Sequence, residues 1–421
     1  MMEENIIKIA DNIFLHEMDG KKFKTNFVAG FFLSDLCKEK ITINALIPAV
    51  LMSGTEKLPT LKDINSKLDD LYGAAMDASS DKIGDKQALQ FYITTIDDKY
   101  ALNGENLLEE SVKLLLELIY NPKLIDGKFS KEYVDKEKEN LKELIKARGN
   151  EKSQYAVSRC IEEMFKGEPY GIYKYGNIED LENINSENLY EQYQWILKNS
   201  EIHFYVSSSS KIDEKWFDIC KEYSNSNVEK NSKITEFKAK ENVSDIVEKQ
   251  DVTQGKLVLG YNLDINVKED LYKVQVYNAI LGSSSNSKMF QNVREKESLA
   301  YTARSMFIKH KSVMLLFAGI EIDKHDKALE IIEKQVDDMK KGEFSDEDIK
   351  DAKIFLENIM NSYKDSQDLL IDISLGQIIM DMNDSIEDMK KKINSITRED
   401  ILYVANRVHL NTKYFLTAKN D

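Results

Sequence analysis

The sequence predicts an α+β protein of two duplicated domains, each a mainly antiparallel β-sheet with helices packed on one face. Three observations lead to this prediction. The chain has 421 residues, which is enough for two domains that each bury a core. Its two halves share short segments in the same order. Segments with strand periodicity are separated by several helix patterns, which favours sheets that helices cover on one face.

A segment that begins with Gly-x-Phe-Ser occurs twice and opens a charged helix pattern both times. Residues 127–134 read GKFSKEYV, and residues 342–349, which lie 215 positions later, read GEFSDEDI. A second pair of segments, Ile184-Asn185-Ser186 and Ile393-Asn394-Ser395, is separated by 209 positions. A helix pattern and an apolar strand follow each member of this pair. Two matches in the same order with similar separations indicate an internal duplication.

The expected elements follow the same order in both halves. In the first half, alternating apolar residues predict strands over 22–33 and 87–96, and an apolar stripe predicts a helix over 107–119 that ends before Asn121-Pro122. Charged and aromatic-rich helices then lead to a strand at 203–206. In the second half, residues 256–262 and 314–322 correspond to the first two strands. We therefore expect an N-terminal domain over 1–210, a linker over the polar stretch 211–250 and a C-terminal domain over 251–421.

Charge and composition narrow the range of partners. With 58 basic and 74 acidic residues, the formal net charge is −16, which argues against nucleic acid or an anionic membrane as a partner. No apolar run approaches the roughly 20 residues that a membrane-spanning helix needs. The first residues are acidic, so we expect no signal peptide and a cytoplasmic location. The cysteines, Cys37, Cys160 and Cys220, are widely spaced and predict neither a disulfide framework nor a thiolate zinc site.

Two segments carry the functional information. Residues 293–301 read VREKESLAY, and residues 44–55 read NALIPAVLMSGT. Together they resemble the two half-sites of the insulinase/pitrilysin family of zinc metallopeptidases, and the resemblance extends over essentially the whole chain. In that family, an inverted HxxEH motif on a helix of the first domain supplies two zinc-binding histidines and a general base.

Alignment on the Gly-Thr pair at 54–55 shows that this motif is degenerate. The resemblance places Ala45 and Ala49 at the histidine positions and Pro48 at the position of the general base. Alanine offers no lone pair, and proline neither binds a metal nor accepts a proton. A proline inside a helix costs about 3 kcal/mol. We therefore expect this helix to be broken at Pro48 or to begin near it.

The third zinc ligand of the family is a glutamate on a later helix. In this chain that helix is expected over 129–148, and the family pattern puts Leu144 at the ligand position with Glu143 beside it. The five histidines show no HxxxH or similar spacing and are expected to be surface or strand residues: His16, His203, His310, His325 and His409. We expect no metal on this chain, and zinc only in a partner subunit.

The second half-site is intact. In the family, an arginine and a tyrosine in an R-E-K-x-x-L-A-Y pattern reach the bound peptide, and the resemblance assigns these roles to Arg294 and Tyr301. Guanidinium and phenol are donors that can polarise a peptide carbonyl. A strand is expected to start directly after Tyr301.

A chain with a degenerate HxxEH motif and an intact second motif resembles family subunits that have lost HxxEH and form a heterodimer with a related sister subunit that retains it. The chain is then expected to be a non-catalytic subunit of a heterodimeric zinc peptidase, with Arg294 and Tyr301 binding peptide and with a possible homodimer when the partner is missing. The strand at 87–96 is a candidate edge strand for peptide addition. The alternative is a purely structural scaffold without a role in proteolysis. An independent hydrolase is disfavoured, because the sequence contains no GxSxG motif.

Overall fold

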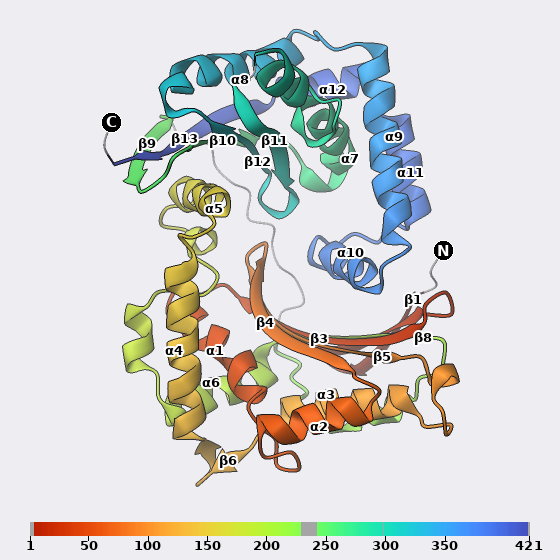
Figure 1. The fold of residues 1–421 in the computed structure, drawn as a ribbon. Helices are drawn as coiled ribbons and strands as arrows, with labels where there is room; N and C mark the ends of the chain where they lie inside the picture. Colours follow the sequence, from red (N-terminus) through yellow and green to blue (C-terminus); the bar gives the residue numbers. More distant parts are fainter. Residues whose placement is uncertain (1–3, 229–241, 298, 420–421) are drawn as a thin grey trace. The chain divides into compact units, whose positions relative to one another are not determined.

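The computed structural model describes residues 4–228, 242–297 and 299–419. These residues form two compact units, each assembled from several stretches of the chain (Figure 1). Unit 1 contains residues 4–146, 172–228 and 367–375. Unit 2 contains residues 147–171, 242–297, 299–366 and 376–419.

Unit 1 is built on a six-stranded sheet with the order β1-β2-β8-β3-β5-β4. All neighbouring strands are antiparallel except β2 and β8, which are parallel. The long strand β3 is rich in aromatic and β-branched residues and is buried along most of its length, as expected of a central strand. The strands are β1 (Glu4–Ala10), β2 (Ile13–Asp19), β3 (Thr25–Asp35), β4 (Ala75–Ile83), β5 (Lys86–Ile96) and β8 (Glu201–Ser208), with a separate hairpin of β6 (Leu124–Ile125) and β7 (Lys128–Phe129).

Several helices pack on one face of this sheet. The helix α3 turns a continuous apolar stripe to strands β3 and β5, and α1 contacts β4 and β5. The helices are α1 (Ile41–Leu51), α2 (Leu61–Asp70), α3 (Leu107–Tyr120), α4 (Lys131–Ala147) and α6 (Ser186–Asn199). Short 3₁₀ segments are η1 (Asp98–Tyr100), η3 (Glu179–Asn183) and η4 (Glu214–Tyr223).

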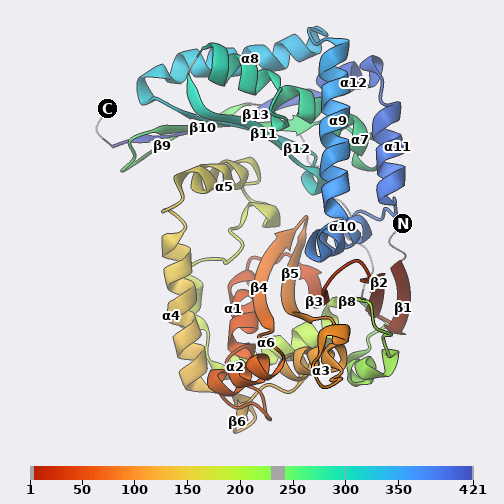
Figure 2. The same cartoon turned by 45° about the vertical axis from the view of Figure 1, so that its right-hand side comes forward.

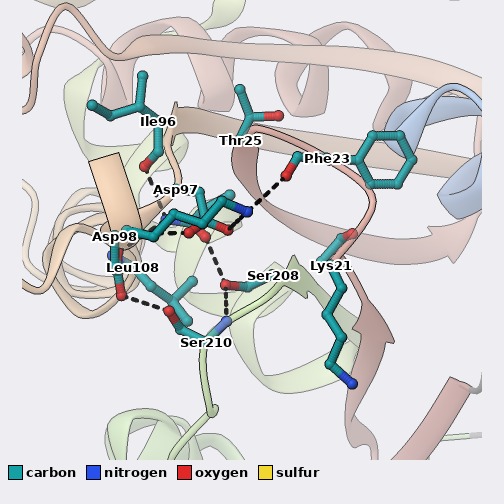
Figure 3. A network of polar contacts seen from close by, with 12 residues as sticks. Lys21, Phe23, Thr25, Ile96, Asp97, Asp98, Leu108, Ser208 and Ser210 are labelled. Atoms are coloured by element: carbon teal, nitrogen blue, oxygen red, sulfur yellow. Dashed lines mark hydrogen bonds and ion pairs between the residues drawn. The ribbon is translucent and has the colours of Figure 1, made fainter. Parts of the chain in front are cut away.

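A polar network fixes the start of α3 against the ends of the central strands (Figure 3). The carboxylate of Asp98 accepts hydrogen bonds from the Leu108 backbone N–H at 2.8 Å and from Ser210 Oγ at 2.8 Å. Asn26 Nδ2 donates to the same carboxylate at 3.2 Å, and Ser208 Oγ donates to Asn26 Oδ1 at 2.6 Å. A negative charge near a helix N-terminus is stabilising, so this network favours a helix that starts here.

Unit 2 is built on a five-stranded sheet with the order β11-β12-β10-β13-β9. Its strands are β9 (Ser244–Gln250), β10 (Gly255–Leu263), β11 (Ala300–Ile308), β12 (Val313–Ile320) and β13 (Val408–Ala418). Its helices include α7 (Val267–Asn278), α8 (His325–Lys340), α9 (Asp346–Tyr363), α11 (Ile386–Ser395) and α12 (Arg398–Ala405). Its short helical segments are η2 (Pro169–Gly171), η5 (Ala279–Ser283), η6 (Met289–Lys296), η7 (Lys309–Lys311) and η8 (Ile322–Lys324).

The two sheets share one topology. The order β2-β8-β3-β5-β4 of unit 1 corresponds strand by strand to β9-β13-β10-β12-β11 of unit 2. The one parallel pair also corresponds, since β2 with β8 matches β9 with β13. The predicted fold class, two duplicated and mainly antiparallel α+β units, is confirmed.

A helix from the other half of the chain covers the second face of each sheet, which the sequence did not predict. The helix α5 (Lys152–Met164) belongs to unit 2 and contacts β10 and β13. The helix α10 (Gln367–Ile379) begins in unit 1, where Figures 1 and 2 show it on the face of the sheet opposite α2 and α3. Both ends of α10 lie 215 positions after those of α5, so the two are equivalent elements of the duplication.

Two expectations about chain organisation are wrong. The strand expected at 87–96 is not an edge strand, because β5 lies between β3 and β4, and β4 forms that edge. The stretch 211–250 is not a linker throughout. Residues 214–223 form η4, which buries Phe217 and Cys220, and residues 244–250 form β9. Part of the expected linker, 229–241, lies outside the described residues.

Candidate functional site

The helix α1 carries the positions at which the family places its zinc ligands. Ala45 and Pro48 are buried and Ala49 is half-buried. Leu144 lies on α4 with 53% of its surface exposed. Methyl, pyrrolidine and isobutyl groups have no lone pair for a metal, so these residues do not fit a zinc ion. Among the described residues, no group of three or more His, Cys, Asp or Glu side chains is arranged to hold a metal.

The expectation of a broken helix at Pro48 is wrong, because α1 continues from Ile41 to Leu51 with the proline inside it. Pro48 lacks the N–H that would bond to the carbonyl of Asn44. Burial offsets this loss, since most residues of α1 lie in the core of unit 1.

A neutral amide network, which no sequence pattern predicted, lies next to the degenerate zinc motif. Asn44 is buried, donates from Nδ2 to Gln87 Oε1 at 2.9 Å and accepts from Gln192 Nε2 at 2.8 Å. Gln87 Nε2 donates in turn to the Ile41 carbonyl at 3.0 Å and to Ser80 Oγ at 3.0 Å. These hydrogen bonds fix α1 to the β4–β5 hairpin and to α6 without any charged group.

Glu143 does not compensate for Leu144. Its carboxylate forms an ion pair with Lys146 at 2.8 Å, one turn further along α4, and both side chains are largely exposed to solvent. The hydrogen bond from Lys146 lowers the pKa of Glu143. A solvated carboxylate in a surface pair binds a metal weakly by itself, so Glu143 forms no ligand set.

Two of the histidines form a buried pair that sequence spacing concealed. His16 on β2 and His203 on β8 are hydrogen-bonded, with His16 Nε2 at 2.9 Å from His203 Nδ1. His16 Nδ1 lies 2.7 Å from Glu4 Oε1, and His203 Nε2 lies 3.2 Å from Glu201 Oε1. A separation of 187 positions hides this contact, which exists only because β2 and β8 are neighbours in the sheet.

The surroundings of the pair disfavour the charged form of His16. Burial lowers the pKa of His16 below its usual value, and the hydrogen bond to Glu4 only partly opposes this effect. Burial by itself raises the pKa of Glu4, but hydrogen bonds from His16 and Ser374 hold it below its usual value. Ser374, on α10, donates to Glu4 at 2.7 Å. The four groups, Glu4, His16, His203 and Glu201, form a line of contacts rather than a convergent metal site.

Arg294 lies in a π-helical turn, Met289–Lys296. Its guanidinium carbon is 4.7 Å from the centre of the Phe290 ring, and its Nε is 3.6 Å from Glu295 Oε1. The side chain is 45% exposed. Single π-helical turns are rare and often occur at functional sites. Ser298, in the middle of the intact motif, lies outside the described residues.

Tyr301 lies at the start of β11, an edge strand of the unit 2 sheet, as expected for a strand that follows the motif. Its side chain is 68% exposed. The register shifts at this residue, because Ala300 pairs with Ile320 while Thr302 pairs with Gly319. Such a bulge on an edge strand redirects a side chain and ends regular pairing. The tyrosine therefore has no role in the core of unit 2.

The fold and the alkyl side chains at the ligand positions define a metallopeptidase homologue without the zinc-binding residues. Residues 183–356 match the family model described as "Peptidase M16 inactive domain". The chain is 34% identical to the "Probable inactive metalloprotease YmfF" of Bacillus subtilis, over 95% of both chains. It is 23% identical to the "Non-peptidase homolog YmxG" of Helicobacter pylori, over 78% of this chain and 72% of that one.

Solved structures show the same fold. A conserved protein from Enterococcus faecalis superposes with a TM-score of 0.88, at 24% identity over 99% of both chains. The chain therefore belongs to the insulinase/pitrilysin family, peptidase family M16, as an inactive member. In the part of the chain that the structure describes, no helix is both long and apolar enough to cross a membrane.

Proposed function

We propose that this chain is the zinc-less subunit of a heterodimeric peptidase and that it supplies Arg294 and Tyr301 to a peptide site shared with an HxxEH-bearing sister. The observation that carries the proposal is the contrast between two segments. The positions of the metal ligands hold alkyl groups, whereas the tyrosine of the second motif is exposed at a strand bulge. A chain that kept this fold only as a scaffold has no need of an exposed phenol at that position.

The chemistry of the two side chains fits peptide binding. A guanidinium presents several N–H donors and a phenol presents one O–H, and both can donate to the carbonyl oxygen of a peptide. Donors aimed at an oxygen on which negative charge develops lower the barrier to acyl transfer. Stacking on Phe290 restricts where the guanidinium of Arg294 lies.

The sister subunit supplies the zinc ion and the general base in this proposal. The chain itself contributes binding and orientation of the peptide and takes no part in proton transfer. The alkyl groups at Ala45, Ala49 and Leu144 support this division of roles, because they offer no ligand.

The test is cleavage of a mixed peptide library by this chain alone, by an HxxEH-bearing sister alone and by the two together, each with and without a chelator. We expect chelator-sensitive cleavage in the mixture only. Arg294→Lys and Tyr301→Phe should each lower kcat/KM of the mixture by roughly 10- to 100-fold, because each removes an oriented donor. Pull-down with the sister should be unchanged.

Two conservative substitutions are matched controls. Arg304→Lys changes another exposed arginine of β11 that stacks on a ring, and Tyr100→Phe changes an exposed tyrosine of unit 1. Neither should alter cleavage. Full activity of the mixture with both Arg294 and Tyr301 changed would favour the scaffold role. Chelator-sensitive cleavage by this chain alone would contradict the proposal that this chain is the zinc-less subunit.

A further inference from the structure

Unit 1 contains a pocket of about 420 Å³ that is separate from the positions of the lost zinc ligands. It is lined by segments that are far apart in the sequence: the loop after α1, the end of α3 with the residues that follow it, α6 from Tyr190 onward and the end of η4. This volume lies in the range of pockets that hold small organic molecules. None of Ala45, Pro48, Ala49 and Leu144 belongs to its lining.

Four tyrosines dominate the lining of this pocket. Tyr120 and Tyr223 form one ring pair, with centres 5.0 Å apart, and Tyr190 and Tyr193 form a second, with centres 5.8 Å apart. The planes within each pair are inclined by 32°. The face of an aromatic ring carries partial negative charge and attracts cations.

Two of the four rings, those of Tyr190 and Tyr193, are held in place by neighbouring groups. Phe129 packs edge-on against Tyr190 and Tyr193, with ring centres 5.5 and 5.4 Å away. Tyr193 donates its hydroxyl hydrogen to the Ile119 carbonyl at 2.7 Å, and Tyr190 accepts from Gln194 Nε2 at 3.2 Å. Side chains fixed in this way lose little conformational entropy when a ligand binds.

The charges around the pocket favour a cation. Glu56 and Glu222 belong to the lining, against one basic side chain, Lys198. Within the ranges that the structure describes, neither glutamate forms an ion pair. Burial, and then the nearby Glu222 carboxylate, raise the pKa of Tyr223. The described lining therefore carries two carboxylates against one basic side chain, an excess of one negative charge.

Helix ends add to this negative potential. Tyr120 is the last residue of α3, Lys198 lies in the last turn of α6, and Tyr223 ends η4. Carbonyl groups at the C-terminal ends of helices carry partial negative charge and favour cations. The ring faces, the carboxylates of Glu56 and Glu222 and the helix C-termini therefore all attract positive charge to this pocket.

From this arrangement we infer that the tyrosine-lined pocket of unit 1 binds an organic ammonium group. The ammonium group stacks on the ring faces of Tyr223 and its neighbours, and the carboxylates of Glu56 and Glu222 balance its charge. The group can belong to a free amine or to a lysine side chain of a peptide, and the shared chemistry is recognition of an alkylated, positively charged nitrogen.

The experiment compares cations with neutral molecules of the same shape on the full-length chain, by calorimetric titration. Choline is paired with 3,3-dimethyl-1-butanol, and Nα-acetyl-lysine methylamide is paired with the 2-aminoheptanoic acid derivative in which a methyl group replaces the ammonium. We expect at least one cation to bind roughly fivefold or more tightly than its neutral partner, as cation–π contacts and a partly screened charge imply. The pair that shows the preference identifies whether the free or the peptide-borne ammonium is the ligand.

Substitutions in the lining test whether the cation binds in this pocket. Tyr223→Leu removes one ring face and Glu222→Gln removes one charge, and each should reduce the preference for the cation at least threefold. Tyr100→Leu, an exposed ring of unit 1 outside the pocket, should leave it unchanged. If Tyr223→Leu strongly lowers the melting temperature of the chain, the result for Glu222→Gln, a change at an exposed position, decides whether the cation binds in this pocket. Equal binding of cations and neutral partners, or a preference that survives Glu222→Gln together with Glu56→Gln, would overturn the inference.

Discussion

Single residues on α1 decide what unit 1 can do chemically. The methyl groups of Ala45 and Ala49 cannot bind a metal. Beside them, the network around Asn44 consists of hydrogen bonds between neutral amides. Neutral hydrogen bonds in the core avoid the large desolvation cost of buried charges. The loss of the motif is therefore accompanied by a local structure that is stable without a metal.

Pro48 lies in the interior of α1, where it removes one backbone hydrogen bond of the helix. We predict that Pro48→Ala raises the free energy of unfolding by about 1–2 kcal/mol. The substitution recovers most of the roughly 3 kcal/mol that an interior proline costs and loses about 1 kcal/mol of buried apolar surface. Urea unfolding followed by circular dichroism measures the change. Pro59→Ala, in the exposed loop after α1, should instead be neutral or slightly destabilising.

The buried His16 makes stability depend on pH. Because burial lowers its pKa in the folded state, the unfolded chain binds more protons between about pH 6.5 and the lowered value. Stability from this residue is complete above about pH 6.5 and is lost as the pH falls, by up to about 1.4 kcal/mol per pH unit.

This dependence is tested with His16→Gln, which keeps a polar side chain between Glu4 and His203 without a titration near neutral pH. The free energy of unfolding is measured from pH 8 to pH 5. Its slope against pH should decrease by up to about 1.4 kcal/mol per pH unit, which corresponds to one proton. His409→Gln, at an exposed position of β13, should keep the slope of the unmodified chain. An unchanged slope in His16→Gln would show that other groups cause the pH dependence.

Among the secondary-structure elements, α5 shows how one carboxylate holds a helix on a sheet. Glu248 on β9 accepts hydrogen bonds from Tyr155 at 2.7 Å and Arg159 at 3.2 Å, both on α5, and from Tyr414 on β13 at 2.8 Å. Burial raises the pKa of Glu248, but the hydrogen bonds, from Tyr155 first, prevail and lower it to about 2. The carboxylate therefore stays ionised, and the contact persists, in all but strongly acidic solution.

We predict that Glu248→Gln lowers the free energy of unfolding by about 2 kcal/mol, since hydrogen bonds to a charged group contribute about 1.5–3 kcal/mol. Hydrogen exchange should become faster at the amides of α5 and β9 than in the rest of unit 2. Glu347→Gln, in an exposed ion pair on α9, should change stability by less than about 0.5 kcal/mol. Equal exchange rates in α5 for both variants would contradict this role of Glu248.

The helix α10 is held in unit 1 by a neutral group instead. Gln367 donates from Nε2 to the carbonyls of Thr25 and Ser207, both at 3.1 Å, and its Oε1 accepts from Thr25 Oγ1 at 2.7 Å. These contacts join the start of α10 to β3 and β8. The two equivalent helices thus occupy equivalent places through unrelated side-chain chemistry.

At the scale of the whole molecule, the exchange of α5 and α10 makes each unit depend on both halves of the sequence. We predict that a chain cut between residues 228 and 242 yields two polypeptides that fold only together. The N-terminal polypeptide lacks α10, and the C-terminal polypeptide lacks α5. Co-expression with a tag on one polypeptide should recover both in one complex with a cooperative thermal transition. Independent folding of either polypeptide with the melting temperature of the intact chain would contradict this prediction.

The sequence by itself determined the duplication, the family and the loss of the zinc ligands. Strand periodicity, the repeated Gly-x-Phe-Ser segments and the two motifs are local in the chain, and local patterns follow directly from side-chain chemistry. Alanine at positions 45 and 49 excludes zinc binding there whatever the surrounding structure. The consequence of Pro48 was predicted incorrectly, because burial of the whole helix outweighed a local preference.

Only the tertiary structure determined the contacts between segments that are far apart in the sequence. It placed β5 inside the sheet rather than at its edge, exchanged α5 and α10, paired His16 with His203 and gathered four tyrosines around one pocket. Each of these features depends on which strands become neighbours and which helix covers which face. Such choices are set by the combined burial of many side chains, and no short stretch of sequence contains that information.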